Sequence, residues 1–320
     1  AFHAFPDKTP RNRLGLARWL LHEDNPLTAR VTVNRLWSRL MGKGLVVTEE
    51  DFGTQGTPPS HPQLLDWLAV DFQSHGWNVK RTIKSLVMSR TYRQSARATS
   101  LQLEKDPDNV WLARGPRVRL PAETIRDQAL AVSGLLSRKM YGPPVYPPNP
   151  IKQVTNAFKG ADVWKTSEGE DRYRRSIYTF LKRSQPHPLF ETFDTSTRDV
   201  CSLRRINTNT PLQSFMTLND EAFVEAAQAL AIRMSKAEGT RPRIVRGLEL
   251  ALLRPADPQK IAPLEKLYQQ SCRQYDTNPQ NAAAMLGRFA QDHPSDQHAE
   301  LASLTVVANV ILNLDEFLTH

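Results

Sequence analysis

Prolines that directly follow helix-capping residues constrain the fold of this chain more than any other sequence feature. Proline breaks a helix interior but is well accommodated at the first helical position. The chain has 23 prolines among 320 residues, and this abundance predicts many short helices with abrupt connections. The pairs of a capping residue and a proline are Asn25-Pro26, Thr210-Pro211 and Asp257-Pro258.

Apolar residues at helical spacing extend this prediction along the chain. The best strand candidate is Ser176–Leu181, which is rich in β-branched and aromatic residues, and residues 44–56 are expected to form a loop or a short strand. We therefore expect a mostly α, multi-helical globular fold with a small β element near residues 176–181. We expect one continuous domain with three parts: a helical part over 1–150, a basic segment over 151–209 and a helical part over 210–320. The predicted helices cover residues 13–21, 26–41, 60–72, 79–89, 121–137, 211–218, 220–235, 242–253, 258–275, 279–289 and 299–318.

The charge balance of the chain predicts anionic partners. Lys and Arg outnumber Asp and Glu by 42 to 33, which gives a net charge of +9. No long Lys/Arg block is present, so a nucleic-acid-binding tail is not expected. The longest apolar run, residues 304–314, is too short to cross a bilayer and predicts a buried helix. The chain begins at Ala1, and we expect it to be a processed or excised segment.

Cofactor motifs are missing from the sequence. It contains two cysteines, Cys201 and Cys272, and no C-x-x-C-H haem attachment motif. No H-x-x-x-H or H-E-x-x-H occurs, so neither a metal site nor a haem is expected in this chain.

Arg30 and Asn34 fall inside the apolar arc of the helix predicted over residues 26–41. A buried arginine is costly unless it is paired, so both residues are expected to be buried and hydrogen-bonded. One interpretation is a structural polar network that joins helices. The other is an anion-binding site.

Glu123 and Asp127 lie one helical turn apart at the start of the helix predicted from Pro121. Paired carboxylates at this spacing are candidates for acid and base catalysis or for binding a metal. The alternative is that they stabilise the first turn of the helix through its dipole, with Arg126 as their neutralising partner.

Arginine pairs on either side of the predicted strand form the densest charge in the chain. Arginine suits carboxylate, sulfate or phosphate, and the helix beginning at Pro211 offers free amides. We expect the pairs to converge in a basic cleft, unless Glu123, Asp127, Asp194 or Asp199 neutralises them internally. The candidate ligand-binding residues are Arg174, Arg175, Tyr178, Lys182, Arg204, Arg205 and Thr210.

Several longer segments, taken together and in order, resemble a known family. The most specific are RLGLARWLLHEDNPLTARVTVNRLW, PPSHPQLLDWLA, LPAETIRDQALAVSGLL, RRSIYTFLKR and CSLRRINTNTPLQSFMTLND. They are similar to the PSD domain, a planctomycete-type, cytochrome-c-associated domain of unknown function. The resemblance covers nearly the whole chain. The family has no established catalytic residues that could be assigned to positions here.

The resemblance implies an extracytoplasmic setting, periplasmic or in the cell envelope. Such domains usually lie at the C-terminal end of large exported proteins, often behind a c-type cytochrome module. Haem c is then expected only in an associated domain or partner. Our first hypothesis is a non-catalytic binding or assembly module with a basic cleft for an anionic ligand, such as an acidic glycan, or for an acidic partner. The alternatives are an enzyme that acts on acidic or sulfated polysaccharide through its paired carboxylates, and a structural component of the cell envelope.

Overall fold

Helices dominate the computed structural model, which describes residues 4–6, 8–151, 153–156, 160–196, 198, 201–202, 205 and 208–319. The chain is 57% helical, which confirms the predicted mostly α class. Within the described residues the first helices are α1 (Arg13–Leu20), α2 (Thr28–Met41), α3 (Pro62–Ser74), α4 (Val79–Met88), α5 (Ser100–Lys105), α6 (Ala122–Ser133) and α7 (Pro188–Thr192). The remaining ones are α8 (Pro211–Asn219), α9 (Glu221–Ser235), α10 (Thr240–Leu252), α11 (Pro258–Thr277), α12 (Pro279–Leu286), α13 (His298–Leu312) and α14 (Asp315–Leu318).

Prolines start several of these helices, as the sequence predicts. Pro211, Pro258 and Pro279 each stand in the first turn of a helix. Asp257 caps α11 by accepting a hydrogen bond from the Gln259 amide at 3.0 Å. The pair Asn25-Pro26 does not follow the same rule, because α2 begins only at Thr28 and Leu27 is its N-cap residue. Proline opens a helix at three of the predicted starts, and the prediction for Pro26 is wrong.

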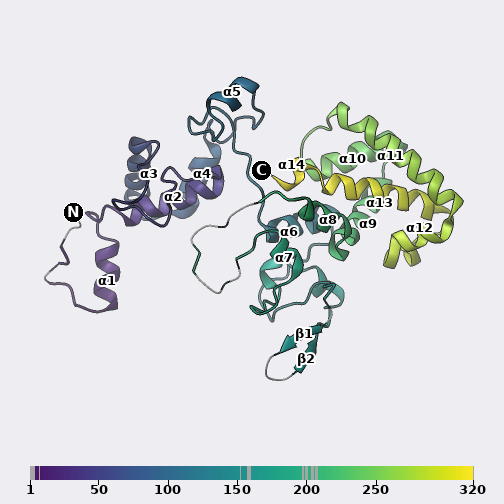
Figure 1. Ribbon diagram of the computed structural model, residues 1–320, viewed down its shortest axis with the longest axis horizontal. Coiled ribbons are helices and arrows are strands. Elements are labelled where there is room, and N and C mark those ends of the chain that lie inside the picture. Colours follow the sequence, from purple (N-terminus) through teal and green to yellow (C-terminus); the bar gives the residue numbers. More distant parts are fainter. Residues whose placement is uncertain are drawn as a thin grey trace. The chain divides into compact units, whose positions relative to one another are not determined.

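Two compact units make up the chain, Ala1–Val118 and Arg119–His320. Helices α1–α5 belong to the first unit and α6–α14 to the second (Figure 1). The division falls earlier than the part boundary expected near residue 150, because α6 packs against α9 of the second unit.

The core of the first unit lies where α2 packs against α3 and α4. Its buried apolar residues include Val33 and Trp37 from α2 and Leu68 and Phe72 from α3. The Phe72 ring meets the Trp77 ring edge-on, with centroids 5.2 Å apart. Val33 and Trp37 on α2 are four residues apart, as are Leu68 and Phe72 on α3. This spacing is the helical period from which the apolar faces were predicted.

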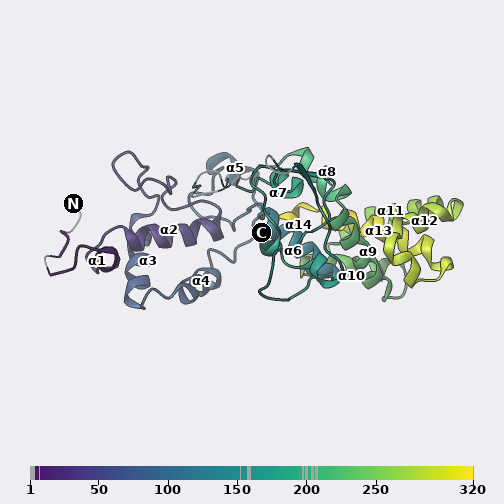
Figure 2. The same ribbon diagram turned by 90° about the horizontal axis from the view of Figure 1, so that it is seen from below.

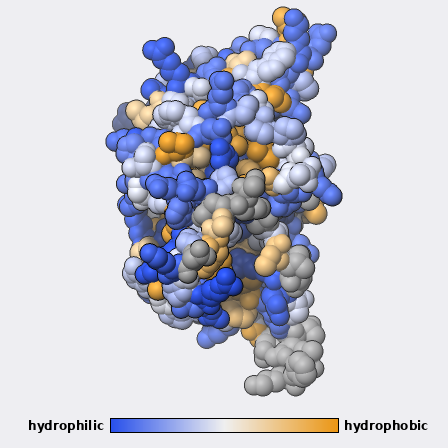
Figure 3. Space-filling model, turned by 90° about the vertical axis from the view of Figure 1, so that its left-hand side faces the viewer, coloured by the Kyte–Doolittle hydropathy of each residue, from blue (hydrophilic) through white to orange (hydrophobic). Residues whose placement is uncertain are grey.

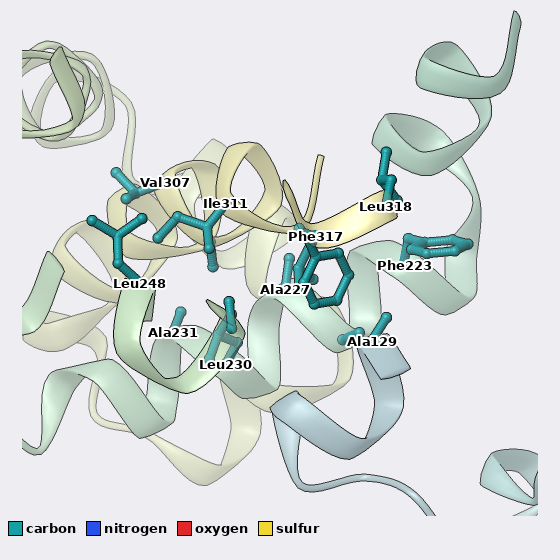
Figure 4. Packing of buried hydrophobic residues seen from close by; sticks show 14 of the residues in the cluster. Ala129, Phe223, Ala227, Leu230, Ala231, Leu248, Val307, Ile311, Phe317 and Leu318 are labelled. Atoms are coloured by element: carbon teal, nitrogen blue, oxygen red, sulfur yellow. The ribbon is translucent and has the colours of Figure 1, made fainter. Parts of the chain in front are cut away.

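Helix α9 is the centre of the second unit and contacts α6, α8, α10 and α13. The labelled side chains in Figure 4 point toward one another from α6, α9, α10, α13 and α14, with Phe317 beside Ala227. Gly247 on α10 allows the close approach to α9, since a Cβ there would lie 2.8 Å from the Met234 sulfur. Figure 2 shows the same group of helices from a second direction.

The prediction of a strand over Ser176–Leu181 is wrong. Ser176–Tyr178 form a short 3-10 helix, and Thr179 makes only an isolated bridge with Val145. The β pairing lies earlier, in the antiparallel hairpin of β1 (Gln153–Asn156) and β2 (Gly160–Val163). The segment's β propensity is overridden because α6 binds its backbone, as described below.

Surface composition is mixed on the face drawn in Figure 3, where hydrophilic residues separate smaller apolar patches. Exposed large apolar residues include Trp67 on α3 and Leu212 and Phe215 on α8. Among the described residues, no helix is both long enough and apolar enough to cross a membrane.

Candidate functional site

Asn34 and Arg30, both on α2, differ in their surroundings. Asn34 is fully buried, and its side-chain amide pairs with the backbone of Val46, donating at 3.0 Å and accepting at 2.9 Å. Arg30 is only partly buried, with 35% of its side chain exposed. Its Nε donates to Asp66 at 2.7 Å and its Nη1 to the carbonyl of Pro26 at 2.6 Å. These contacts fit the structural interpretation, although the expected burial is found only for Asn34.

Arg174 is one of the most deeply buried side chains in the second unit, at 1% exposure. Its guanidinium donates to the carbonyls of Tyr141 and Pro143 and lies 3.9 Å from the centroid of the Tyr178 ring. Because its described partners are internal, Arg174 holds the chain around residues 141–143 and does not present its charge to a ligand.

Arg126 is a buried charged residue on α6, 2% exposed. Its Nη1 donates to the Arg174 carbonyl at 2.9 Å and its Nη2 to the Arg172 carbonyl at 3.1 Å. Burial lowers the pKa of this guanidinium, and the nearby carboxylates of Asp127 and Asp220 oppose that effect. Beyond the neutralising role expected from the sequence, Arg126 anchors the segment around residue 174. In the sequence, the only sign that Arg126 is buried is its position one helical turn before Leu130, which is also buried.

Asp127 holds the same segment from the next position on α6. Its Oδ1 accepts from both the amide and the hydroxyl of Ser176, each at 2.7 Å. Burial raises the pKa of Asp127, and the two Ser176 hydrogen bonds only partly offset this effect. The carboxylate fixes the 3-10 helix of residues 176–178, so it has a structural task in addition to any chemical one.

Glu123 is clasped by Arg205, which donates to its two carboxylate oxygens at 2.6 and 2.9 Å. Burial alone would raise the pKa of Glu123, but the hydrogen bonds from Arg205 and its positive charge hold that pKa below the ordinary value. One of the acids considered as an internal partner is thus the partner of Arg205. The bidentate geometry is the arrangement that arginine favours with carboxylates.

Of the other predicted ligand-binding residues, Arg175 lies close to Tyr178, with its guanidinium carbon 5.9 Å from the centroid of the Tyr178 ring. Arg175 lies against Met140, and the Tyr178 hydroxyl accepts from the Tyr141 amide at 2.9 Å. Tyr178 and Lys182 do not share a strand face, because no strand forms there. Thr210 is the exposed N-cap residue of α8 and makes no side-chain capping bond. Arg204 lies outside the described residues.

The predicted cleft of converging arginines is therefore not what the described residues form. Arg174 is used internally, and Arg205 is paired with Glu123. The structure does bring Glu123, a candidate catalytic residue, to the wall of a cavity of about 350 Å³ in the second unit. The lining residues are Glu123, Ser176, Ile177, Thr179, Leu181, Phe190, Thr195 and Arg198.

Three polar groups of this cavity are chemically notable. The hydroxyls of Thr179 and Thr195 are buried and have no hydrogen-bond partner among the described residues. Arg198 is exposed, and its positive charge acts on the Glu123 carboxylate, where it helps to lower the pKa. Its φ of 62° is unusual for a residue other than glycine. Sequence reasoning missed all three residues, since isolated threonines and a single arginine carry no spacing signal.

Within the described ranges, no group of three or more His, Cys, Asp or Glu side chains could hold a metal ion. His187 is buried, with Nε2 2.8 Å from the Pro148 carbonyl oxygen, and Nδ1 accepts from the Leu189 amide at 3.3 Å. Both ring nitrogens are therefore occupied within the protein.

Comparison with known proteins places the chain in a family. No curated protein and no solved structure matches it. A family model named PSD1 and described as "Protein of unknown function (DUF1553)" matches residues 12–268. Because this match covers well over half of the chain, the protein belongs to the PSD1 family of proteins of unknown function.

Proposed function

We propose that this chain is a non-catalytic binding module and that an anionic ligand binds in the cavity beside the first turn of α6. The observation that carries the proposal is the pair of buried threonine hydroxyls, Thr179 and Thr195, next to the exposed Arg198. A buried hydroxyl without a partner is costly, so native structures usually provide one. An anion held by Arg198 would accept hydrogen bonds from both hydroxyls.

The proposed setting follows from the resemblance described above. The module would belong to an exported multidomain protein, extracytoplasmic in location and linked to a c-type cytochrome module. Haem c would then be carried by that associated module. The net charge of +9 fits a binding partner of negative charge, whether a small ligand, an acidic glycan or an acidic protein surface.

The enzyme hypothesis has weaker support. Glu123 is clasped by two hydrogen bonds from Arg205, and Asp127 accepts two from Ser176. A catalytic acid or base needs an oxygen within hydrogen-bond reach of its substrate. Among the two candidates only Glu123 lines the cavity, so the paired-carboxylate arrangement that polysaccharide hydrolysis requires is not supported there.

A binding screen with a matched pair of variants tests the proposal. Small carboxylates, sulfate monoesters and acidic oligosaccharides are titrated calorimetrically into the wild type, Arg198→Ala and Arg183→Ala. Arg183 is also exposed and lies near the cavity in sequence, but it does not line it. We expect at least one anion to bind and Arg198→Ala to weaken it tenfold or more, about 1.4 kcal/mol. Arg183→Ala should bind like the wild type. If no anion binds, or if both variants behave alike, the proposed binding function is wrong. The alternative of a structural component of the cell envelope is then favoured.

A further inference from the structure

The size of the cavity limits how much of a ligand it can enclose. Ligand pockets usually span about 300–1,000 Å³, so a cavity of about 350 Å³ lies at the lower end of that range. Since a water molecule occupies roughly 30 Å³ of liquid, the space corresponds to about a dozen water-sized groups. One ring or one short chain fits inside this volume, and several linked sugar rings would extend beyond it.

The charge of the cavity wall restricts the ligand further. Of the described lining residues, only Glu123 and Arg198 carry charge. The Glu123 charge is matched by Arg205, which donates to both carboxylate oxygens. The Arg198 charge also acts on Glu123 and helps to lower the pKa of that carboxyl. Two arginines therefore act on one carboxylate, and the three groups together leave one net positive charge. A second negative charge on the ligand would meet the Glu123 carboxylate and be repelled by it.

The remaining lining residues indicate the chemistry of the uncharged part of the ligand, which we call its body. Ile177, Leu181 and Phe190 supply an apolar surface, while Thr179 and Thr195 supply two hydroxyls. A carboxylate can accept from a guanidinium and from hydroxyls at the same time, because each of its oxygens has two acceptor positions.

We infer that the ligand of this cavity is a small monocarboxylate, with its carboxylate on Arg198 and its body against the apolar wall. This inference rests on the proposed anion-binding function and narrows it from anions in general to molecules with a single negative charge. The inference also distinguishes this cavity from a binding site for sulfated or polyuronic glycans. Such a site would need several cationic side chains without acidic partners.

The experiment compares probes that carry no charge, one negative charge or several negative charges. Galacturonate and phenylacetate provide a hydroxylated and an apolar body, and each is paired with its neutral methyl ester. A disaccharide carrying several sulfates is the polyanionic probe. All are titrated calorimetrically into the whole chain and into the variants Arg198→Ala, Thr179→Val and Arg183→Ala.

We expect at least one of the two carboxylates to bind, with its ester at least tenfold weaker. Arg198→Ala should weaken binding at least tenfold and Thr179→Val severalfold, while Arg183→Ala should leave it unchanged. The sulfated disaccharide should bind no more tightly than the carboxylate. If the disaccharide binds tenfold more tightly in an Arg198-dependent manner, the monocarboxylate inference is overturned and the proposed function stands. If no probe depends on Arg198, the proposed function fails as well.

Discussion

Arg205 donates two hydrogen bonds to Glu123 across 82 residues of chain, and so joins the segment before α8 to the first turn of α6. Both side chains are about one-quarter exposed, at 27% and 26%. The pair thus lies between a solvated surface ion pair and a buried one. Its acid forms part of the cavity wall, so the pair shapes the candidate site while neutralising its own charge.

Removing one partner of this pair should destabilise the second unit moderately. We expect Arg205→Ala to lower the free energy of unfolding by about 1–2 kcal/mol, between the values typical of exposed and buried pairs. Arg205→Lys should recover only part of this loss, since lysine keeps the charge but cannot form the two-pronged contact. Urea unfolding of the three proteins measures the difference. Equal stability of all three would show that the pair contributes nothing.

Asn34 and Arg30 should respond differently to truncation, although they lie one turn apart on α2. Asn34→Ala leaves the buried amide and carbonyl of Val46 without partners and should cost about 2–3 kcal/mol. Arg30→Ala removes a partly solvated ion pair with Asp66 and should cost about 1 kcal/mol or less. Thermal and urea unfolding of both variants provide the comparison. A larger loss for Arg30→Ala would contradict the assignment of Asn34 as the residue that pins this core.

Asp220 should make the stability of the second unit depend on pH. Burial raises the pKa of this carboxyl to about 6, although the Ala222 amide and the Arg126 charge act in the opposite direction. The folded state therefore holds the proton more tightly than the unfolded one. The stability from this group is complete below pH 3.8 and is lost as the pH rises through 6. Asp220→Asn keeps a capping residue and should abolish this loss, which is about 2–3 kcal/mol between pH 4 and pH 7.5.

The comparison must be made between variants, because His187 acts in the opposite direction over the same pH range. Burial lowers the pKa of His187 to about 4, so its contribution to stability is lost as the pH falls from 6.5 through 4. His187→Gln is the control that removes this effect and leaves Asp220 in place. Unfolding by urea at pH 4, 5, 6 and 7.5 in both single variants and the double variant separates the two groups. If Asp220→Asn has the same pH dependence of stability as the wild type, the Asp220 carboxyl has an ordinary pKa in the folded protein and the prediction is wrong.

The sequence by itself determined the helical class and most helix starts, because these depend on contacts within a few residues. Proline at positions 211, 258 and 279 fixes the backbone angle of a first turn wherever the helix later packs. The buried state of Asn34 also followed from spacing along one helix. Such features can be predicted without knowing which elements pack against each other.

Only the tertiary structure decided the state of residues 174–178 and the composition of the cavity. The local preference of residues 176–181 is for a strand, but Asp127 binds the Ser176 amide and Arg126 binds the Arg174 carbonyl just before it. The hydrogen bonds of one buried and one partly buried charge outweigh a propensity of about 1 kcal/mol. The same contacts turn Arg174 inward, away from the cleft that its neighbours in sequence suggested. The cavity draws Glu123, Thr179 and Arg198 from separate segments, and no local pattern links residues that only folding brings together.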